Sequence, residues 1–302
     1  MSLNSGFDYK ERVDGVGPSM TVLEYLSGRY LHSTESVWRD RLGGGRVFLD
    51  GLPACATDLL RCGQELVWRR PPWDEPDVPL SYAVLHEDED LLVVAKPSGL
   101  PTIPAGGFLN HTLLARVRQS YPKATPVHRL GRGTSGVVLF ALSGVARSAL
   151  GALFRRGEVV KTYRALASGN PERDAFSVDA SIGPVPHPRL GTINAACLTG
   201  KRALSRVRVL ERRESCSLVE VQIETGRPHQ IRIHLAAAGH PLVGDPLYAA
   251  GGCFKDGETA LPGDLGYWLH AQRLEFRHPV RRVEIEIFCL PPPQLRSAGV
   301  HV

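Results

Sequence analysis

The sequence lacks a long hydrophobic run. No stretch of about 18 consecutive apolar residues occurs, which is roughly what a helix needs to cross a bilayer, so we expect no membrane-spanning segment. The start of the chain, Met1–Val13, has no apolar core of the kind found in signal peptides, and its acidic residues Asp8 and Glu11 are unusual in transit peptides. We therefore expect a cytoplasmic protein that does not engage a membrane.

Cysteine is scarce, and none of the six cysteines forms a C-x-x-C pair. This spacing argues against a zinc ribbon and against a dithiol redox motif. Scattered cysteines in a chain of 302 residues are typical of reduced thiols in the cytoplasm. A lone catalytic cysteine has no motif to support it, and we predict no metal site.

Lysine is rare as well, because the basic residues comprise 6 lysines and 30 arginines. Arginine presents a planar fork of donors that grips phosphate and stacks on bases. A GC-rich genome enriches arginine too, whatever the function. The net charge of +5 is therefore compatible with a nucleic-acid partner and does not establish one.

Proline marks the clearest boundary. Four prolines lie within Arg69–Pro79, which predicts a stiff, extended linker over residues 71–79. We predict a small module over residues 1–70, a main domain over 80–290 and a tail over 291–302. In the small module we expect a helix beginning near Thr21, a second helix capped by Ser36 and a hairpin that turns at Asp50–Gly51.

The main domain alternates short apolar runs with turn signals, which favours an α+β fold with a largely antiparallel mixed sheet. Ile231–Leu235 fits either a helix or a strand. A helix is predicted over Val145–Arg156. Strands are predicted over Leu66–Trp68, Leu91–Ala95, Gly136–Leu142, Ser217–Glu224 and Val283–Phe288.

Two strings carry most of the chemistry. Within Val127–Gly136, three glycines spell G-x-G-x-x-G, the pattern of a dinucleotide site, but a strand-like run follows it where that site requires a helix. A glycine-rich turn is the simpler interpretation. The second string, Glu224–Tyr248, contains three histidines and Asp245 without metal-ligand spacing, and two arginines, Arg227 and Arg232, that suit phosphate or carboxylate.

In order along the chain, these strings resemble the RNA pseudouridine synthases of the large-subunit-rRNA/tRNA (RluA-like) type. Val127–Gly136 resembles the catalytic loop of that family, and Thr225–Leu235 with Gly239–Tyr248 resembles its second signature. Lys161–Ala165 matches its short K-x-Y-x-A motif. The opening and closing strands of its catalytic domain resemble Asp90–Gly99 and Leu269–Phe276. Residues 1–70 more weakly resemble a degenerate S4-like RNA-binding module.

The resemblance implies isomerisation of uridine to pseudouridine in structured rRNA or tRNA by a protein that needs no cofactor, with a monomer as the default state. The target nucleotide must leave the RNA stack before chemistry can reach it. Arg129 would fill the vacated stack, Tyr163 would lie against the uracil and accept the C5 proton, and Arg232 would face the catalytic aspartate. The other RNA-binding candidates are Arg39, Arg46, Arg132, Thr134, Arg227 and His229.

The sequence departs from the family at one position, because Gly131 stands where the catalytic aspartate is expected. Glycine can neither attack the sugar nor remove a proton. No acidic residue occurs from Pro122 to Gly157, so Glu224 and Asp245 are the nearest candidate replacements by motif. Two hypotheses follow: an active synthase with a displaced carboxylate or variant mechanism, and a catalytically inactive RNA-binding paralogue. In either case Arg232 should pair with another carboxylate or face solvent.

Overall fold

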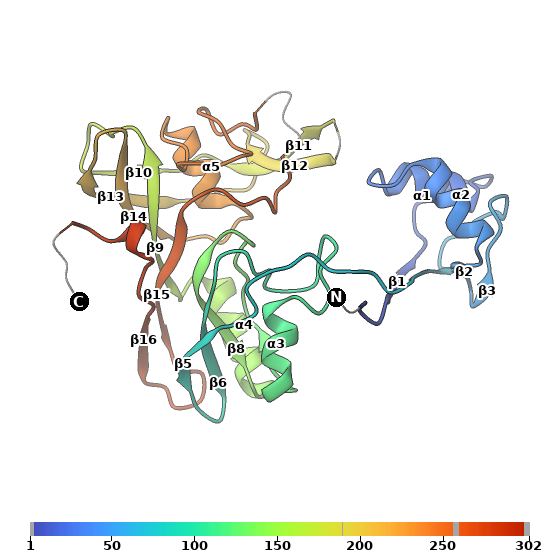
Figure 1. The fold of residues 1–302 in the computed structure, drawn as a ribbon, viewed down its shortest axis with the longest axis horizontal. Coiled ribbons are helices and arrows are strands. Elements are labelled where there is room, and N and C mark those ends of the chain that lie inside the picture. The colour runs from blue at the N-terminus through green and yellow to red at the C-terminus, as the bar shows by residue number, and fades with distance from the viewer. Residues whose placement is uncertain (1–2, 189, 256–259, 299–302) are drawn as a thin grey trace. The chain divides into compact units, whose positions relative to one another are not determined.

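The computed structural model describes residues 3–188, 190–255 and 260–298. The chain divides into two compact units (Figure 1). The first comprises Met1–Glu75 together with Pro186–Thr192, and the second comprises Pro76–Val185 together with Ile193–Val302. None of the described helices is both long and apolar enough to span a bilayer.

The N-terminal unit contains an antiparallel sheet with two short helices. The strand order is β1-β4-β2-β3. Strand β1, at the sheet edge, was not predicted from the sequence, because Phe7–Arg12 is almost wholly exposed and only Phe7 and Tyr9 alternate with polar residues. The elements are β1 (Phe7–Arg12), α1 (Val22–Arg29), α2 (Glu35–Gly43), β2 (Val47–Leu49), β3 (Leu52–Pro53) and β4 (Glu65–Arg70).

Local signals set the helix ends of this unit. The predicted start of α1 is confirmed: Thr21 caps it and forms a reciprocal capping box with Glu24. The predicted cap of α2 was wrong, because the hydroxyl of Thr34 rather than Ser36 accepts from the Val37 N–H. The predicted hairpin turn is confirmed, with Asp50 and Gly51 both at positive φ.

The second unit is built on a ten-stranded mixed sheet, in which eight strands follow the order β10-β13-β14-β9-β15-β8-β6-β5. Strand β16 pairs with β15, and β7 pairs with β8. The pairing is antiparallel except between β15 and β8, which run parallel. The strands are β5 (Ala83–Glu87), β6 (Leu91–Lys96), β7 (Thr125–Pro126), β8 (Ser135–Ala141), β9 (Val160–Ser168), β10 (Ala175–Val178), β13 (Ser205–Arg212), β14 (Cys216–Ile223), β15 (Leu269–Arg277) and β16 (Glu284–Phe288).

The sheet is buried on both faces, which explains the continuous apolar runs of its central strands. Along β6, Leu92 packs in one hydrophobic cluster and Val93 in the other. Helix α3 (Leu113–Ser120) contributes to the first cluster, and α4 (Gly144–Arg156) contributes to the second. The remaining elements are a separate hairpin, β11 (Ile182–His187) with β12 (Gly191–Ala196), the helix α5 (Gln230–Ala237) and a short 3-10 helix (Pro293–Leu295).

The predicted elements of the main domain are confirmed to within a residue or two. Helix α5 resolves the ambiguous run Ile231–Leu235. The mixed, largely antiparallel sheet also agrees with the predicted fold class. Strand β8 begins at Ser135, within the glycine string, so the loop does not lead into a helix as a dinucleotide site requires.

Candidate functional site

The loop Arg129–Thr134 is held by side chains from a neighbouring segment. Thr102 Oγ1 donates to Leu130 O at 2.9 Å and accepts from Leu130 N at 3.2 Å. Ser98 Oγ donates to Gly133 O at 2.8 Å. The buried ammonium of Lys96 donates to Leu100 O at 2.6 Å and to Arg132 O at 3.3 Å. The loop backbone is therefore fixed although residue 131 has no side chain.

Gly131 is exposed and does not have a positive φ. An ideal Cβ at this position would lie 3.2 Å from Tyr267 Oη and 3.7 Å from Thr134 Oγ1. Leaving the adjacent residues aside, no other described atom comes within 4 Å of that Cβ. No described carboxylate therefore occupies the place of the missing side chain.

Two of the three glycines in this string are required by packing. A Cβ at Gly133 would lie 2.9 Å from Tyr267 Cζ. At Gly136 it would lie 2.1 Å from Ala271 O, because the parallel strands β8 and β15 meet there, and the φ of +112° also favours glycine. At these two positions glycine is required because other parts of the same chain pack against the backbone, and not because a bound nucleotide approaches it.

Tyr163 lies on β9, two strands away from the start of β8. It pairs with Ala271 on β15, and Ala271 in turn pairs with Gly136. Its ring is buried in the same cluster as Leu130 and Ile231, which directly precede Gly131 and Arg232 in the sequence. Burial raises the pKa of Tyr163 to about 12, so the phenol is protonated at neutral pH.

The second signature forms a turn that leads into α5. His229 adopts a left-handed conformation with φ 56° at the start of the helix. Its Nδ1 lies 2.8 Å from the hydroxyl of Tyr248, which itself donates to Asn194 O, so Nδ1 carries the proton and Nε2 is left as an acceptor. Burial, aided by the nearby cations Arg232 and Arg129, lowers the pKa of His229 to about 4.

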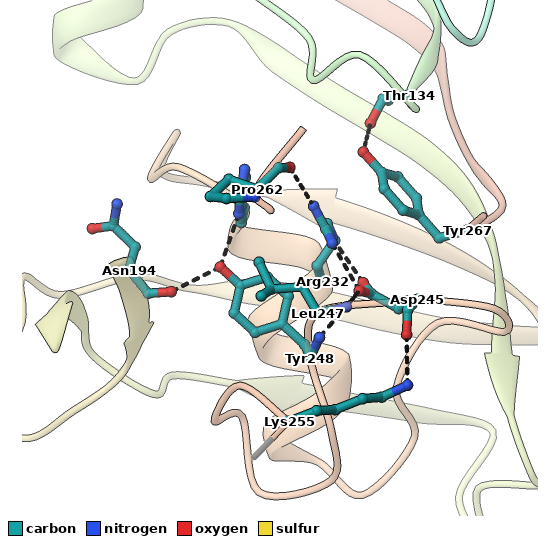
Figure 2. A network of polar contacts seen from close by, with 10 residues as sticks. Thr134, Asn194, Arg232, Asp245, Leu247, Tyr248, Lys255, Pro262 and Tyr267 are labelled. Atoms are coloured by element: carbon teal, nitrogen blue, oxygen red, sulfur yellow. Dashed lines mark hydrogen bonds and ion pairs between the residues drawn. The ribbon is translucent and has the colours of Figure 1, made fainter. Parts of the chain in front are cut away.

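Arg232 projects from α5 and forms a bidentate ion pair with Asp245 (Figure 2). Both N···O distances are 2.7 Å. The two side chains are 2% and 1% exposed. The remaining guanidinium nitrogen donates to Pro262 O at 3.1 Å. Of the two predicted alternatives for Arg232, a carboxylate partner or exposure to solvent, the structure shows the first, and Asp245 is that partner.

Asp245 is held as an anion that accepts several hydrogen bonds at once. Burial alone would raise its pKa, but the guanidinium of Arg232 and the N–H groups of Leu247 and Tyr248 outweigh burial and lower it. A carboxylate so fully engaged is a poor nucleophile. The other suspected replacement, Glu224, is an exposed partner of Arg206 at 2.6 Å.

The guanidinium of Arg232 lies between two aromatic rings (Figure 2). Its Cζ is 5.0 Å from the ring centroid of Tyr248 and 4.3 Å from that of Tyr267. The hydroxyl of Tyr267 lies 3.4 Å from Thr134 Oγ1. Tyr267 therefore bridges Arg232 and the glycine loop, which brings the two signature strings together.

The remaining histidines of the second string have separate partners. His234 contacts Ser205 Oγ and Ala180 O, and His240 contacts Ser168 O. Arg227 is also used structurally, because its Nε donates to Arg202 O. Among the described residues no group of three potential ligands is placed to hold a metal.

The other arginines predicted to bind RNA differ in their exposure and in their interaction partners. Arg129 is exposed at the edge of the loop. Arg132 lies against the ring of Phe108, and its buried Nε has no hydrogen-bond partner within the described structure. In the N-terminal unit, Arg39 forms an exposed ion pair with Glu35, and Arg46 is exposed.

A cavity of about 720 Å³ borders part of the loop. Gly133 and Tyr267 line it together with the exposed Trp268. Neither Gly131, Tyr163 nor Arg232 is among its lining residues. The cavity therefore adjoins the site through Gly133 and Tyr267 and is not lined by these three residues.

Comparison with known proteins gives a consistent result. Residues 90–237 match the sequence model of the RNA pseudouridylate synthase family. An RNA pseudouridine synthase of Synechocystis is 44% identical over 92% of this chain and 97% of its own length. The chain belongs to the RNA pseudouridine synthase family. The predicted family is thus confirmed, and with it a role in RNA modification.

Further relatives share the same family name. RNA pseudouridine synthase 5 of Arabidopsis thaliana is 39% identical over 98% of this chain and 95% of its own length. The solved structure of human RNA Pseudouridylate Synthase Domain Containing 1 has a TM-score of 0.57 at 26% identity, covering 74% of this chain and 89% of that one. This likeness extends the family assignment to the fold.

Sequence reasoning missed two contributors to the site. Tyr267 belongs to no signature string, and its only signal is its position two residues before the motif that begins at Leu269. Lys96 follows the predicted strand Leu91–Ala95 and was given no role, although a lysine directly after an apolar run indicates a polar contact at its tip. Both act through tertiary contacts with the loop.

Proposed function

We propose that this pseudouridine synthase converts uridine to pseudouridine in structured rRNA or tRNA, and that its catalytic pocket is intact apart from residue 131. The observation that carries the proposal is the contact of Tyr267 with both the ring-facing cation Arg232 and the loop at Gly131. A Neisseria meningitidis relative named Ribosomal large subunit pseudouridine synthase D, which is 34% identical over 85% of this chain and 71% of its own length, supports rRNA as the substrate class.

In this proposal the rigid loop presents Arg129 and Arg132 to the RNA. The exposed guanidinium of Arg129 stacks in the place of the flipped nucleotide, which a planar cation can do while it donates hydrogen bonds. Arg132 is half-buried and follows Gly131 directly, so it is placed beside the position that the target nucleotide would occupy. His229 offers Nε2 as an acceptor. Tyr163, whose hydroxyl is protonated at neutral pH, lies against uracil and relays the C5 proton as the reaction ends: its oxygen accepts that proton while its own hydroxyl proton passes to the group that leaves C1′.

These residues need no resident cofactor for the isomerisation, since no atoms are gained or lost and no electrons are exchanged. We also propose a cytoplasmic location, which the six free thiols support. An S4-like role for the N-terminal unit remains part of the proposal, supported by its exposed arginines.

A second candidate function is RNA binding without catalysis. It is favoured by the absence of any described carboxylate at the place of the residue 131 side chain, and by the engagement of Asp245 and Glu224 in other ion pairs. The protein would then hold its RNA in the pocket without modifying it.

The decisive experiment maps pseudouridines in cellular RNA with and without the gene. Purified protein is then incubated with RNA from the deletion strain, and conversion at the mapped uridine is measured. Tyr163→Phe should bind the RNA normally and lose activity by roughly 10²–10⁴-fold, as expected for loss of a group that transfers protons. If the deletion removes no pseudouridine and the purified protein binds RNA without converting it, the protein is the inactive binder.

A further inference from the structure

The space that a side chain at residue 131 would occupy is exposed to solvent on one side and bordered by the Tyr267 hydroxyl on the other. Gly131 is exposed, whereas Tyr267 is only 6% exposed. The Tyr267 hydroxyl lies 3.2 Å from an ideal Cβ at Gly131. A ribose that approaches the loop where an aspartate would project therefore meets the phenol of Tyr267.

The ring of Tyr267 is held on several sides. Its Cζ, Cε1 and Oη would all lie within 3.1 Å of a Cβ at Gly133, so the ring packs directly on the loop backbone. Just before it, the carbonyl of Gly266 would lie 2.2 Å from a Cβ at Gly244, so the two backbones are in close contact there. On its face lies Arg232. Such fixation is what a group needs if it is to meet a sugar in one orientation.

We infer that Tyr267 is a catalytic residue whose hydroxyl replaces the absent carboxylate and attacks C1′ of the target uridine. The inference rests on the proposed function. Tyrosine is one of the side chains that form covalent intermediates in enzymes, and some glycosidases use it to attack the anomeric carbon of a sugar. C1′ of a nucleoside is an anomeric carbon of the same chemical kind.

The reaction balances without an external base. The Tyr267 Oη–C1′ bond forms as the C1′–N1 bond breaks, and the phenol proton passes to N1 of the departing uracil. The uracil turns, C5 attacks C1′, and the Oη–C1′ bond breaks. The proton leaves C5 to Tyr163, whose own hydroxyl proton restores Tyr267. In the net change C1′ moves from N1 to C5 and one hydrogen moves from C5 to N1, with no oxidation or reduction.

Arg232 assists this chemistry from the ring face. As the phenol loses its proton, negative charge spreads over the oxygen and the ring, and a guanidinium over that face stabilises it. Asp245 keeps the guanidinium in place with its two 2.7 Å hydrogen bonds. This gives Arg232 a role in a chain that has no carboxylate at residue 131.

The test compares the parent with Tyr267→Phe on RNA from the deletion strain. Tyr267→Phe should slow conversion on the order of 10³-fold or more, as for loss of a nucleophile, with unchanged affinity for the RNA. Tyr121→Phe is the matched control: it also removes one hydroxyl, which donates to the exposed Glu87 outside the site, and should leave the rate unchanged. A Tyr267→Phe variant that is as active as the control overturns the inference and leaves the proposed function standing.

A second readout identifies the attacking group. In a transcript of the mapped region made with 5-fluorouridine, fluorine makes uracil a better leaving group and C5 a poorer nucleophile, so the covalent intermediate should accumulate. Protease digestion and mass spectrometry should find the nucleotide on the peptide that contains Tyr267. A nucleotide on another side chain overturns the inference but not the function. A parent that binds RNA and converts no uridine overturns both.

Discussion

Arg232 and Asp245 face each other as a buried bidentate pair, with both N···O distances at 2.7 Å. The pair joins α5 to the segment that follows it, and it commits the guanidinium that the family resemblance assigned to a catalytic aspartate. Arg232 therefore has a carboxylate partner although residue 131 supplies none, and one face of its guanidinium is turned to Tyr267.

This pair should be a large contributor to stability. Asp245→Ala would leave the guanidinium buried without its partner, which typically costs about 3–5 kcal/mol of the free energy of unfolding. Urea denaturation measures that free energy. Glu224→Ala is the control, because its ion pair with Arg206 is exposed and should be worth no more than about 1 kcal/mol. Equal losses for the two variants would contradict the structural role given to Asp245.

The glycine string makes a graded prediction. Gly131→Ala should cost the least of the three, about 1 kcal/mol or less, because the φ is ordinary and one tight contact of 3.2 Å, to Tyr267 Oη, has to yield by a few tenths of an ångström. Gly133→Ala should cost about 1–3 kcal/mol, since its Cβ would press on the buried Tyr267 ring. Gly136→Ala should cost more than either, because it combines a positive φ with a 2.1 Å approach to Ala271 O. Thermal or urea unfolding of the three variants should reproduce this order, and a flat series would refute it.

The sequence allowed the family and most elements of the main domain to be predicted, because these depend on local patterns. Residues such as Tyr163 and Arg232 lie within short contiguous motifs, which can be identified from the sequence alone. The limits appear where local signals compete. Thr34 and Ser36 are equally good caps in isolation, and Ile231–Leu235 alternates apolar residues with Arg232 and His234 as a strand would, although all five residues are buried in α5. Only packing decides such cases.

Tertiary partners were harder to predict than elements. The link from Arg232 through Tyr267 to Gly131 joins residues that are far apart in the sequence and carries no shared motif. The exposed edge strand Phe7–Arg12 was missed for a similar reason, because its backbone hydrogen bonds to β4, rather than an apolar face, define it.

Stability should depend on pH through a half-buried histidine. His128 stacks on Phe154, and its Nε2 accepts from Leu139 N, which requires the neutral ring. Burial lowers its pKa from 6.5 to about 4. Between these pH values the unfolded chain binds the proton and the folded chain does not. The contribution of neutral His128 to the free energy of unfolding is therefore fully present above pH 6.5 and is lost as the pH falls toward 4.

The corresponding measurement is the free energy of unfolding between pH 7 and pH 4 for the parent and His128→Gln. The glutamine keeps an acceptor but does not titrate, so the variant should lose less stability over this range, by at most about 3 kcal/mol. Parallel curves for the two proteins would show that His128 does not contribute to the pH dependence.

The N-terminal arginines should contribute to RNA affinity by neutralising phosphates. Replacing Arg39 and Arg46 by Gln together should weaken binding and reduce the slope of log affinity against log salt by about 0.7–0.9 for each phosphate that is no longer neutralised. Arg208→Gln serves as the control, because this exposed arginine pairs with Glu220 on the sheet of the other unit. A slope that is unchanged in the double variant would remove these two residues from the RNA interface.

The final prediction concerns residue 131 itself. Gly131→Asp supplies the carboxylate that the family resemblance expects, but its Cβ would lie 3.2 Å from Tyr267 Oη, so the phenol restricts where the carboxylate can go. Combining it with Tyr267→Phe removes that oxygen and keeps the ring on Arg232. If the two groups serve the same step, the double variant should recover activity that Tyr267→Phe alone has lost. The nearby guanidinium should keep the new carboxylate ionised.

The matched control for this rescue is Gly131→Asn combined with Tyr267→Phe, since asparagine has nearly the same shape as aspartate and no nucleophilic oxygen of comparable strength. Conversion of uridine at the mapped position is the readout, with RNA affinity measured in parallel. Recovery with Asp and none with Asn shows that a nucleophile is required at the point where Gly131 and Tyr267 meet. Equal activity of the Asp and Asn double variants would mean that the space, rather than the chemistry of the added group, limits the reaction, because the two side chains fill that space alike.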